Sequence, residues 1–370
     1  MKGQRQIERK AILALEDGTV VEGRGFGAEG LVLGELVFNT SMTGYVEALT
    51  DPSYSGQILM MTYPLIGNYG VCSEDYESDR IQVRGFVVKQ LCREPSNWRS
   101  EKDLDQFLHE SGVPGIEGVD TRMLTLKARM YGTMKAALAV FAEKDMPSKE
   151  ELIEKARQQP HISEIDLVDK VCVEKPRFTD AKGKYDAVLV DCGVKNSIIR
   201  QLNLRGVNLH VVPYDFPPKK ILGYDPDAVF ISNGPGDPAR VTPTIQTIRG
   251  LLGNVPIAGI CLGLQLTCLA LGGNTFKLKF GHRGSNQPVK DLATGRVFIS
   301  TQNHGFAADA KSLEKAGLEL AQINLNDMTV EGIRHKALPL MAVQYHPEAG
   351  PGPHDTYFFF DSFMKMLEQR

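Results

Sequence analysis

A cysteine and a histidine–glutamate pair, about 85 residues apart, are the residues of this chain best suited to chemistry. Cys261 lies in Gly259-Ile-Cys-Leu-Gly263, between an apolar run at 255–260 that predicts a buried strand and a leucine-rich run at 262–271 that predicts a helix. A turn from strand to helix is where α/β enzymes present a nucleophile. Free N–H groups at the helix start favour a thiolate and a developing oxyanion. A single cysteine in an apolar stretch is more often a core residue, and that is our interpretation of Cys268.

The second candidate is His346-Pro347-Glu348, which follows an apolar run at 340–345 that predicts a strand. Side chains two residues apart in an extended segment share a face, so His346 and Glu348 can point the same way. A carboxylate beside an imidazole fixes its tautomer and supports the imidazolium. Alone, such a pair could equally be a surface pair. Together with Cys261 it predicts a Cys–His–Glu triad for nucleophilic catalysis.

Two glycine-containing segments follow other predicted strands. Asn233-Gly-Pro-Gly-Asp-Pro238 comes after a strand at 228–232, and its glycines could direct backbone amides into a site. The same residues would also make a plain tight turn. Thr301-Gln-Asn-His-Gly-Phe306 offers an amide, an imidazole and a glycine that allows close approach to a polar substrate, although an ordinary loop is equally consistent with it.

The elements around these motifs alternate in type. The second half predicts strands at 185–190, 207–212, 228–232, 255–260 and 340–345 and helices at 196–205, 243–252, 262–271 and 356–367. Short connections between alternating strands and helices indicate a mostly parallel sheet covered by helices, an α/β fold. Sites in such sheets lie at the carboxyl ends of the strands, which is where Cys261 and the 233–238 segment fall.

The first half predicts a different, α+β arrangement. It contains a hairpin at 11–23 with an Asp17-Gly18 turn, strands at 57–63 and 81–91, and helices at 104–110 and 150–159. The Thr-, Ser- and Gly-rich segment that follows a short strand within 34–57 is typical of a surface loop. Polar residues at 174–184 predict a linker, which gives domains at 1–178 and 185–370.

Composition narrows the class of protein. The chain has 370 residues and a formal net charge of −3, which does not suggest a nucleic-acid-binding protein. No apolar run reaches about 18 residues, so no membrane span is expected. The polar N-terminus lacks the apolar segment of a signal peptide. Six scattered cysteines argue against a disulfide framework and against a zinc site, and favour a cytoplasmic protein.

The second half resembles class I (triad) glutamine amidotransferase domains in Gly259-Ile-Cys-Leu-Gly-Leu-Gln265 and His346-Pro-Glu348. These superfamily motifs alone leave anthranilate, GMP and CTP synthases open. Asn39-Thr-Ser-Met-Thr-Gly-Tyr45 and Asp51-Pro-Ser-Tyr-Ser-Gly-Gln57 extend the resemblance to the small, glutaminase subunits of carbamoyl phosphate synthetase. Further matching motifs lie at 232–238, 280–282, 303–306 and 346–355.

The resemblance implies a reaction and a set of roles. Cys261, His346 and Glu348 would hydrolyse glutamine to glutamate and ammonia through a γ-glutamyl thioester. Gly234 and Leu262 would supply the oxyanion-hole amides. The N-terminal half would dock the large synthetase subunit. The glutamine-binding positions carried over from the family are Ser53, Gly234, Gly236, Leu262, Gln265, Asn303, Gly305 and Phe306.

The resemblance also implies where the other chemistry takes place. This chain is expected to need no metal or organic cofactor, and it contains no Gly-x-x-x-x-Gly-Lys-Ser/Thr loop. ATP and magnesium are therefore expected on the large subunit, which in the family makes carbamoyl phosphate from bicarbonate, ammonia and ATP for arginine synthesis, pyrimidine synthesis or both. The alternatives are a free-standing Cys–His–Glu hydrolase, such as a γ-glutamyl hydrolase or peptidase, and a non-catalytic binding module.

Overall fold

The chain forms two compact units, Met1–Ile162 and Ser163–Arg370. The structure is a computed structural model that describes residues 9–369, apart from the side chain at position 143. The division falls earlier than the linker expected at 174–184. In that segment β10 (Arg177–Thr179) pairs with β12 (Val207–Pro213), so the segment belongs to the sheet of the second unit.

The first unit is built on a closed barrel with the strand order β1-β2-β8-β6-β4-β3-β9. Its strands are β1 (Lys10–Leu15), β2 (Val20–Gly27), β3 (Gly30–Asn39), β4 (Gln57–Met61), β6 (Gly85–Val87), β8 (Pro114–Glu117) and β9 (Met134–Phe141). The short strands β5 (Leu65–Ile66) and β7 (Gln90–Leu91) pair separately. The helices are α1 (Tyr45–Thr50), α2 (Leu104–Glu110), α3 (Thr121–Tyr131) and α4 (Lys149–Gln158).

In this unit, the elements that short sequence patterns specify were predicted better than the elements that depend on contacts distant in the sequence. The first hairpin is confirmed, with Ala14 opposite Val20 and Gly18 at φ 94° in the turn. The helix at 104–110 is confirmed as well. The strand expected at 81–91 is wrong, because only the short β6 and β7 form there. The segment expected as a surface loop is also different: it contains α1 and the short 3₁₀ helix η1 (Pro52–Tyr54), both largely buried.

The second unit contains a ten-stranded sheet in the order β10-β12-β11-β13-β14-β19-β18-β17-β15-β16. The five strands from β12 to β19 in this order run parallel, and antiparallel strands extend the sheet at both ends. The remaining strands are β11 (Tyr185–Asp191), β13 (Ala228–Ile231), β14 (Ile257–Ile260), β15 (Thr275–Asp291), β16 (Val297–Ala308), β17 (Leu318–Asn324), β18 (Val330–His335) and β19 (Leu340–Val343).

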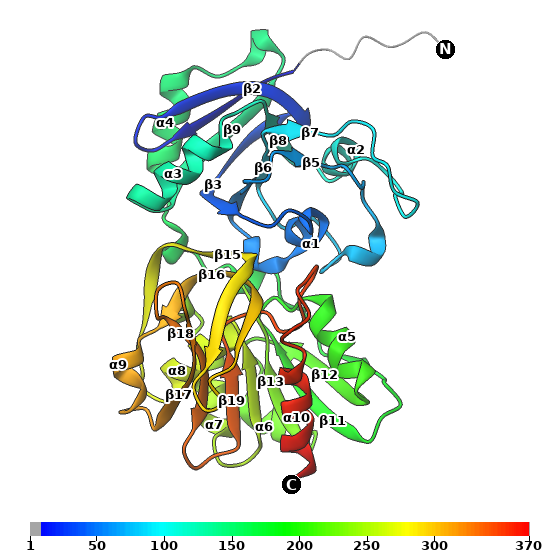
Figure 1. Ribbon diagram of the computed structural model, residues 1–370, viewed down its shortest axis with the longest axis vertical. Helices are drawn as coiled ribbons and strands as arrows, with labels where there is room; N and C mark the ends of the chain where they lie inside the picture. The colour runs from blue at the N-terminus through cyan, green and yellow to red at the C-terminus, as the bar shows by residue number, and fades with distance from the viewer. Residues whose placement is uncertain (1–8, 370) are drawn as a thin grey trace. The chain divides into compact units, whose positions relative to one another are not determined.

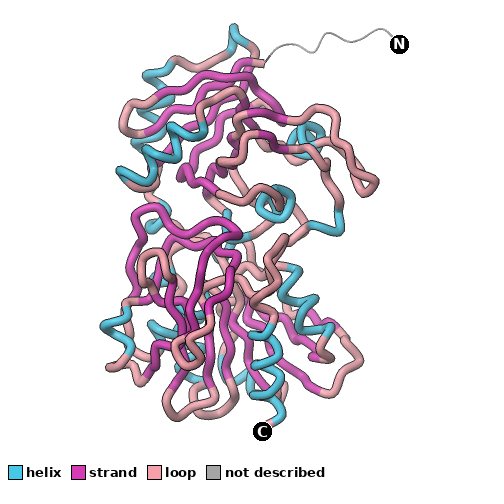
Figure 2. The backbone as a smooth tube through the Cα atoms, viewed as in Figure 1, coloured by secondary structure: helices cyan, strands magenta, loops and turns pink. Residues whose placement is uncertain are grey.

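Helices cover both faces of this sheet because its central strands are apolar on both sides. Along β11, Val188 packs into one buried cluster and Leu189 into the other, as the period of two in a strand requires. Helices α5 and α10 lie on one face, and α6, α7 and α8 on the other (Figures 1 and 2). Their bounds are α5 (Asn196–Leu204), α6 (Pro218–Leu222), α7 (Thr242–Leu251), α8 (Leu262–Ala270) and α10 (Phe358–Glu368); α9 (Ala310–Leu313) is one short turn.

The α/β prediction for this half is confirmed, and the predicted elements agree with the observed ones within about two residues at most ends. What the sequence pattern did not predict is the antiparallel extension by β15–β18. Among the helices of residues 9–369, none is both long enough and apolar enough to cross a membrane.

Candidate functional site

Cys261 occupies the turn between β14 and α8, at the carboxyl edge of the parallel sheet. Its backbone has φ 55° and ψ −103°, a left-handed conformation that is strained for a residue with a side chain. Adjacent glycines make room for the turn: a Cβ on Gly259 would come within 2.9 Å of Gly263, and one on Gly263 within 2.4 Å of the Ile231 carbonyl oxygen. The thiol is buried and donates to the Asn303 carbonyl oxygen at 3.7 Å.

His346 and Glu348 lie beyond the end of β19, which is hydrogen-bonded to β14. The backbone N–H of His346 donates to the Thr301 carbonyl oxygen at 2.8 Å, so the segment is tied to β16. Nδ1 of His346 lies 2.6 Å from Oε1 of Glu348, and the two residues are at most 2% exposed. Because the carboxylate is an acceptor, Nδ1 carries the proton and Nε2 is left facing away from Glu348.

Each member of the His346–Glu348 pair stabilises the charged form of the other. Burial alone would lower the pKa of His346, but the charge of Glu348 and the adjacent Cys261 thiol raise it to about 10. Burial would raise the pKa of Glu348, but Lys195 and His346 lower it to about 2. Nε2 of His346 makes no hydrogen bond of normal geometry within residues 9–369 and so remains available to a reacting group. The pair therefore favours an imidazolium beside a carboxylate.

Lys195 is a site residue that the sequence analysis missed. It lies between β11 and α5 and is 3% exposed. Its Nζ lies 3.1 Å from Oε1 of Glu348 and donates to the Ala349 carbonyl oxygen at 2.7 Å. Its position in the sequence could have identified it. Lys195 follows a parallel strand, so it lies at the same sheet edge as Cys261.

The 303–306 segment of β16 packs on the first turns of α8. The side-chain amide nitrogen of Gln265 donates to the Phe306 carbonyl oxygen at 2.8 Å and to Gln344 at 3.1 Å. Asn303 contacts the thiol through its carbonyl oxygen. The structure thus places Asn303 against the Cys261 thiol and Phe306 against Gln265 in the first turns of α8.

The loop after β13 also reaches this edge. A Cβ on Gly234 would meet the Cys192 carbonyl oxygen at 2.0 Å and the Leu262 side chain at 2.9 Å, so Gly234 lies directly beside the start of α8. Leu262 is the first residue of α8, and the first N–H groups of a helix have no partner within it. Gly236 in the same loop has φ 87°, which explains a glycine there.

Ser53 lies in the first unit, within η1, where the Asp51 side chain accepts a hydrogen bond from the Ser53 backbone N–H at 2.9 Å. Ser53 is buried. A contribution of Ser53 to a glutamine site remains a prediction from the family resemblance.

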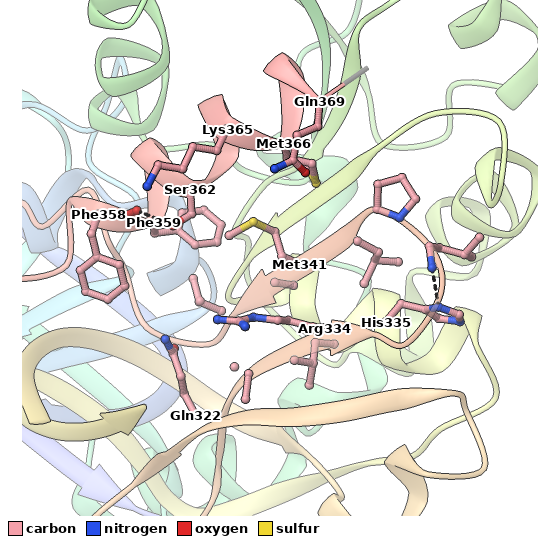
Figure 3. A pocket seen from close by; sticks show the side chains of 18 residues that line it. Gln322, Arg334, His335, Met341, Phe358, Phe359, Ser362, Lys365, Met366 and Gln369 are labelled. Atoms are coloured by element: carbon pink, nitrogen blue, oxygen red, sulfur yellow. Dashed lines mark hydrogen bonds between the residues drawn. The ribbon is translucent and has the colours of Figure 1, made fainter. Parts of the chain in front are cut away.

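A cavity of about 400 Å³ lies elsewhere in the second unit, between α10 and the strands β18 and β19 (Figure 3). Phe358, Phe359 and Met341 supply apolar walls, and Arg334 and Lys365 supply positive charge. None of the predicted site residues lines this cavity, so the candidate site is defined by its chemistry and not by this pocket.

Comparison with known proteins gives matches over nearly the whole chain. Residues 13–138 match the family described as carbamoyl-phosphate synthase small chain, CPSase domain, and residues 188–366 match glutamine amidotransferase class-I. A carbamoyl phosphate synthase small chain from Archaeoglobus fulgidus is 68% identical over 97% of this chain and 99% of its own length. Similar chains from Methanopyrus kandleri and Methanosarcina mazei are 56% and 52% identical, each over 97% of this chain and 99% of its own length.

Proposed function

Because the chain belongs to the carbamoyl phosphate synthase small-chain family and carries a class I glutamine amidotransferase domain, we propose that it hydrolyses glutamine through Cys261, His346 and Glu348 and delivers ammonia to a large synthetase subunit. The observation that carries the proposal is the strained turn that holds the Cys261 thiol at the sheet edge with the His346–Glu348 pair, whose Nδ1–Oε1 distance is 2.6 Å.

The first half of the reaction forms a thioester. The Cys261 thiolate attacks the side-chain carboxamide carbon of glutamine, and the carbonyl oxygen becomes an oxyanion. The backbone N–H groups of Leu262 and Gly234 stabilise that charge; one such donor is typically worth about 2.7–4 kcal/mol. His346 then gives its Nε2 proton to the leaving nitrogen, the carbon–nitrogen bond breaks, and ammonia leaves a γ-glutamyl thioester on Cys261.

The second half regenerates the thiolate. His346, now neutral, takes a proton from a water molecule as it attacks the thioester carbon. The carbon–sulfur bond breaks and glutamate is released. Glu348 remains a carboxylate throughout: it holds the Nδ1–H tautomer of His346 and stabilises the imidazolium. Lys195 is a positioning residue in this scheme, because its charge keeps Glu348 ionised in a buried site.

The remaining roles rest on family membership. We assign Gly236, Gln265, Asn303, Gly305 and Phe306, with Ser53, to the glutamine pocket. No metal or organic cofactor takes part in the glutaminase reaction. ATP and magnesium belong to the large subunit, whose product serves arginine synthesis, pyrimidine synthesis or both. The first unit, for which we find no catalytic pair, is the candidate docking domain for that subunit.

The test is synthesis by the complex of this chain with its large subunit. Cys261→Ser should abolish carbamoyl phosphate formation from glutamine and leave formation from added ammonia largely intact, because only ammonia release uses the thiolate. Loss of both activities would indicate a structural role for Cys261. Peptide or γ-glutamyl hydrolysis that exceeds glutamine hydrolysis would favour a free-standing hydrolase.

A further inference from the structure

A second cluster of polar side chains lies on the β15–β16 side of the same unit. His282, His304 and Glu331 come from β15, β16 and β18, and all three are buried. One nitrogen or oxygen atom of each lies within 4.8 Å of the others. His282 and His304 are direct partners across the antiparallel β15–β16 pair, and their rings meet edge to face at 4.9 Å. Among residues 9–369 this is the one such group with the composition of a metal site.

His282 is held as a metal ligand would be. Its Nε2 lies 2.7 Å from the Asp327 carboxylate, which accepts the Nε2 proton. The lone pair of the neutral ring is therefore on Nδ1, which is buried and has no hydrogen-bond partner within residues 9–369. A histidine that donates its other ring N–H to a carboxylate is the usual outer-shell arrangement at zinc sites.

His304 is oriented in the same manner by a backbone carbonyl. Its Nδ1 donates to the Phe306 oxygen at 2.8 Å, which leaves the lone pair of the neutral ring on Nε2. That lone pair faces Oε1 of Gln302 at 3.1 Å, and the amide nitrogen of Gln302 is directed toward Glu331 at 2.8 Å. Two acceptors therefore face each other inside the protein, an arrangement that a cation between them would make favourable.

Glu331 supplies the negative charge. Oε1 accepts hydrogen bonds from the Gln302 and Asn324 amides at 2.8 and 2.9 Å, whereas the buried Oε2 has no partner within the described chain. Nδ1 of His282 lies 3.8 Å from Oε1, beyond hydrogen-bond distance. A buried carboxylate with one unsatisfied oxygen and no cation at contact distance is costly, and a doubly charged ion would balance Glu331 and Asp327 together.

We propose that His282, His304 and Glu331 bind a zinc-class divalent cation as a structural site, with Asp327 and the Phe306 carbonyl orienting the two imidazoles. Two nitrogens and a carboxylate oxygen at about 2.0–2.2 Å from the ion match the ligands that zinc prefers. Binding would draw the three ligand atoms together by about 1 Å or more relative to their present spacing. The ion takes no part in glutamine hydrolysis. This site departs from the sequence-based expectation of no metal, which considered cysteine spacing and not these strands.

The position of the cluster gives the ion a mechanical role. It would tie β15, β16 and β18 together where the pairs β15–β16 and β17–β18 have register shifts. His304 adjoins Asn303, whose carbonyl oxygen contacts the Cys261 thiol. A bound ion would therefore hold in place the backbone that faces the nucleophile.

The test begins with zinc content and coordination in the full chain, after zinc is supplied and unbound metal is removed by gel filtration. We expect about one zinc per chain by elemental analysis, and a zinc-edge X-ray absorption spectrum with nitrogen and oxygen neighbours, imidazole scattering and no sulfur. Cys261→Ser should keep the ion, which excludes binding by the catalytic thiol. Zinc should also raise the unfolding temperature.

Variants locate the ion. Glu331→Gln and, independently, His282→Asn should lose it, and Asp327→Asn should weaken binding by roughly 10–100-fold. Glu319→Gln, the same change at an exposed position of β17, should bind zinc normally. The proposal is overturned if the wild type retains no zinc, if sulfur appears in the coordination shell, or if folded His282→Asn binds zinc as tightly as the wild type. If the variants fail to fold, the wild-type spectrum decides.

Discussion

Among the single residues, the site depends on two buried ion pairs that share the Glu348 carboxylate, one with Lys195 and one with His346; we call these three residues the charge relay. Each member is buried, and the two contacts share Oε1 of Glu348, at 3.1 Å from Lys195 and 2.6 Å from His346. A carboxylate in this position is stable only while both partners are present, because removal of one leaves an uncompensated buried charge. The relay therefore links the stability of the second unit to its chemistry.

Lys195→Met tests the first contact. The substitution keeps an unbranched side chain, one atom shorter, and removes the cation beside Glu348, so we expect the free energy of unfolding to fall by about 3–5 kcal/mol. Glutamine hydrolysis should fall as well. Lys365→Met, on the exposed face of α10, is the control and should change stability by less than about 0.5 kcal/mol. Chemical denaturation measures both changes. If the two variants lose the same free energy of unfolding, Lys195 does not stabilise the buried Glu348 charge.

The depressed pKa of Glu348 makes a prediction about pH. A carboxylate whose pKa falls from 4.5 to about 2 on folding stabilises the native state above pH 4.5, and this contribution is lost as the pH falls toward 2. The full contribution is on the order of 3 kcal/mol.

The comparison between wild type and Glu348→Gln isolates this contribution, because other acidic groups titrate in both proteins. The difference between their free energies of unfolding should shrink as the pH falls from about 5 toward 2, and it should also shrink as the pH rises from about 6.5 toward 10, because the raised pKa of His346 depends on the Glu348 charge. A difference that does not depend on pH would show that Glu348 is not ionised preferentially in the folded protein.

The site residues that were predicted from sequence lie in short motifs, in which the spacing alone fixes how the residues are placed relative to one another. Cys261 between glycines, and histidine two residues before glutamate, predicted a candidate nucleophile at a strand-to-helix turn and a pair that the structure places at hydrogen-bond distance. Lys195, His282 and Glu331 were missed because no short motif relates them to their partners. Lys195 and Glu348 are far apart in the sequence, and only the parallel sheet brings the ends of β11 and β19 to one edge.

At the scale of elements, the site requires α8 to start directly on top of β13 and β14. Gly263 makes this approach possible, since a Cβ there would lie 2.4 Å from the Ile231 carbonyl oxygen and 3.0 Å from its carbon. These neighbours are backbone atoms in the centre of the sheet and cannot move easily.

Gly263→Ala should therefore push the first turn of α8 away from the sheet and displace Cys261 and the Leu262 N–H. We expect a loss of stability of about 1–3 kcal/mol and a large loss of glutamine hydrolysis. Gly223→Ala is the matched control: Gly223 has φ −66°, and an added Cβ would come no closer than 3.3 Å to the Lys220 carbonyl oxygen. Thermal unfolding and glutamate release would measure both effects, and an active, stable Gly263→Ala protein would contradict the packing argument.

Periodicity predicted the elements of the second unit well because buried parallel strands and amphipathic helices alternate there with short loops. It failed where pairing is long-range. The barrel of the first unit joins β3 to β9 and β2 to β8 across long stretches of chain, and no local pattern specifies those pairings. The antiparallel strands β15 to β18 are likewise arranged by their contacts with one another.

At the scale of the whole molecule, the chain has a plausible ammonia-releasing site and no recognised ATP-binding loop. Ammonia released into water would be protonated and diluted, so we expect a stable complex with the large synthetase subunit. The subunit should also raise glutamine hydrolysis, by about 5–150-fold if the coupling acts through affinity.

Size-exclusion chromatography of the co-expressed chains tests association, and glutamate release with and without the large subunit tests activation. The Cys261→Ser chain should bind the large subunit normally, which separates docking from catalysis. If this chain elutes alone at micromolar concentration and hydrolyses glutamine at full rate, the assignment to a synthetase complex is wrong.

The proposed mechanism requires that Cys261 becomes acylated by glutamine. The most direct measurement is mass spectrometry of the complex, quenched in acid during turnover of isotope-labelled glutamine and digested to peptides. We predict a labelled γ-glutamyl group on the peptide that contains Cys261, and no such group in Cys261→Ala. Turnover without any acylated peptide, or with the label on Cys192 or Cys268 instead, would show that Cys261 is not the nucleophile.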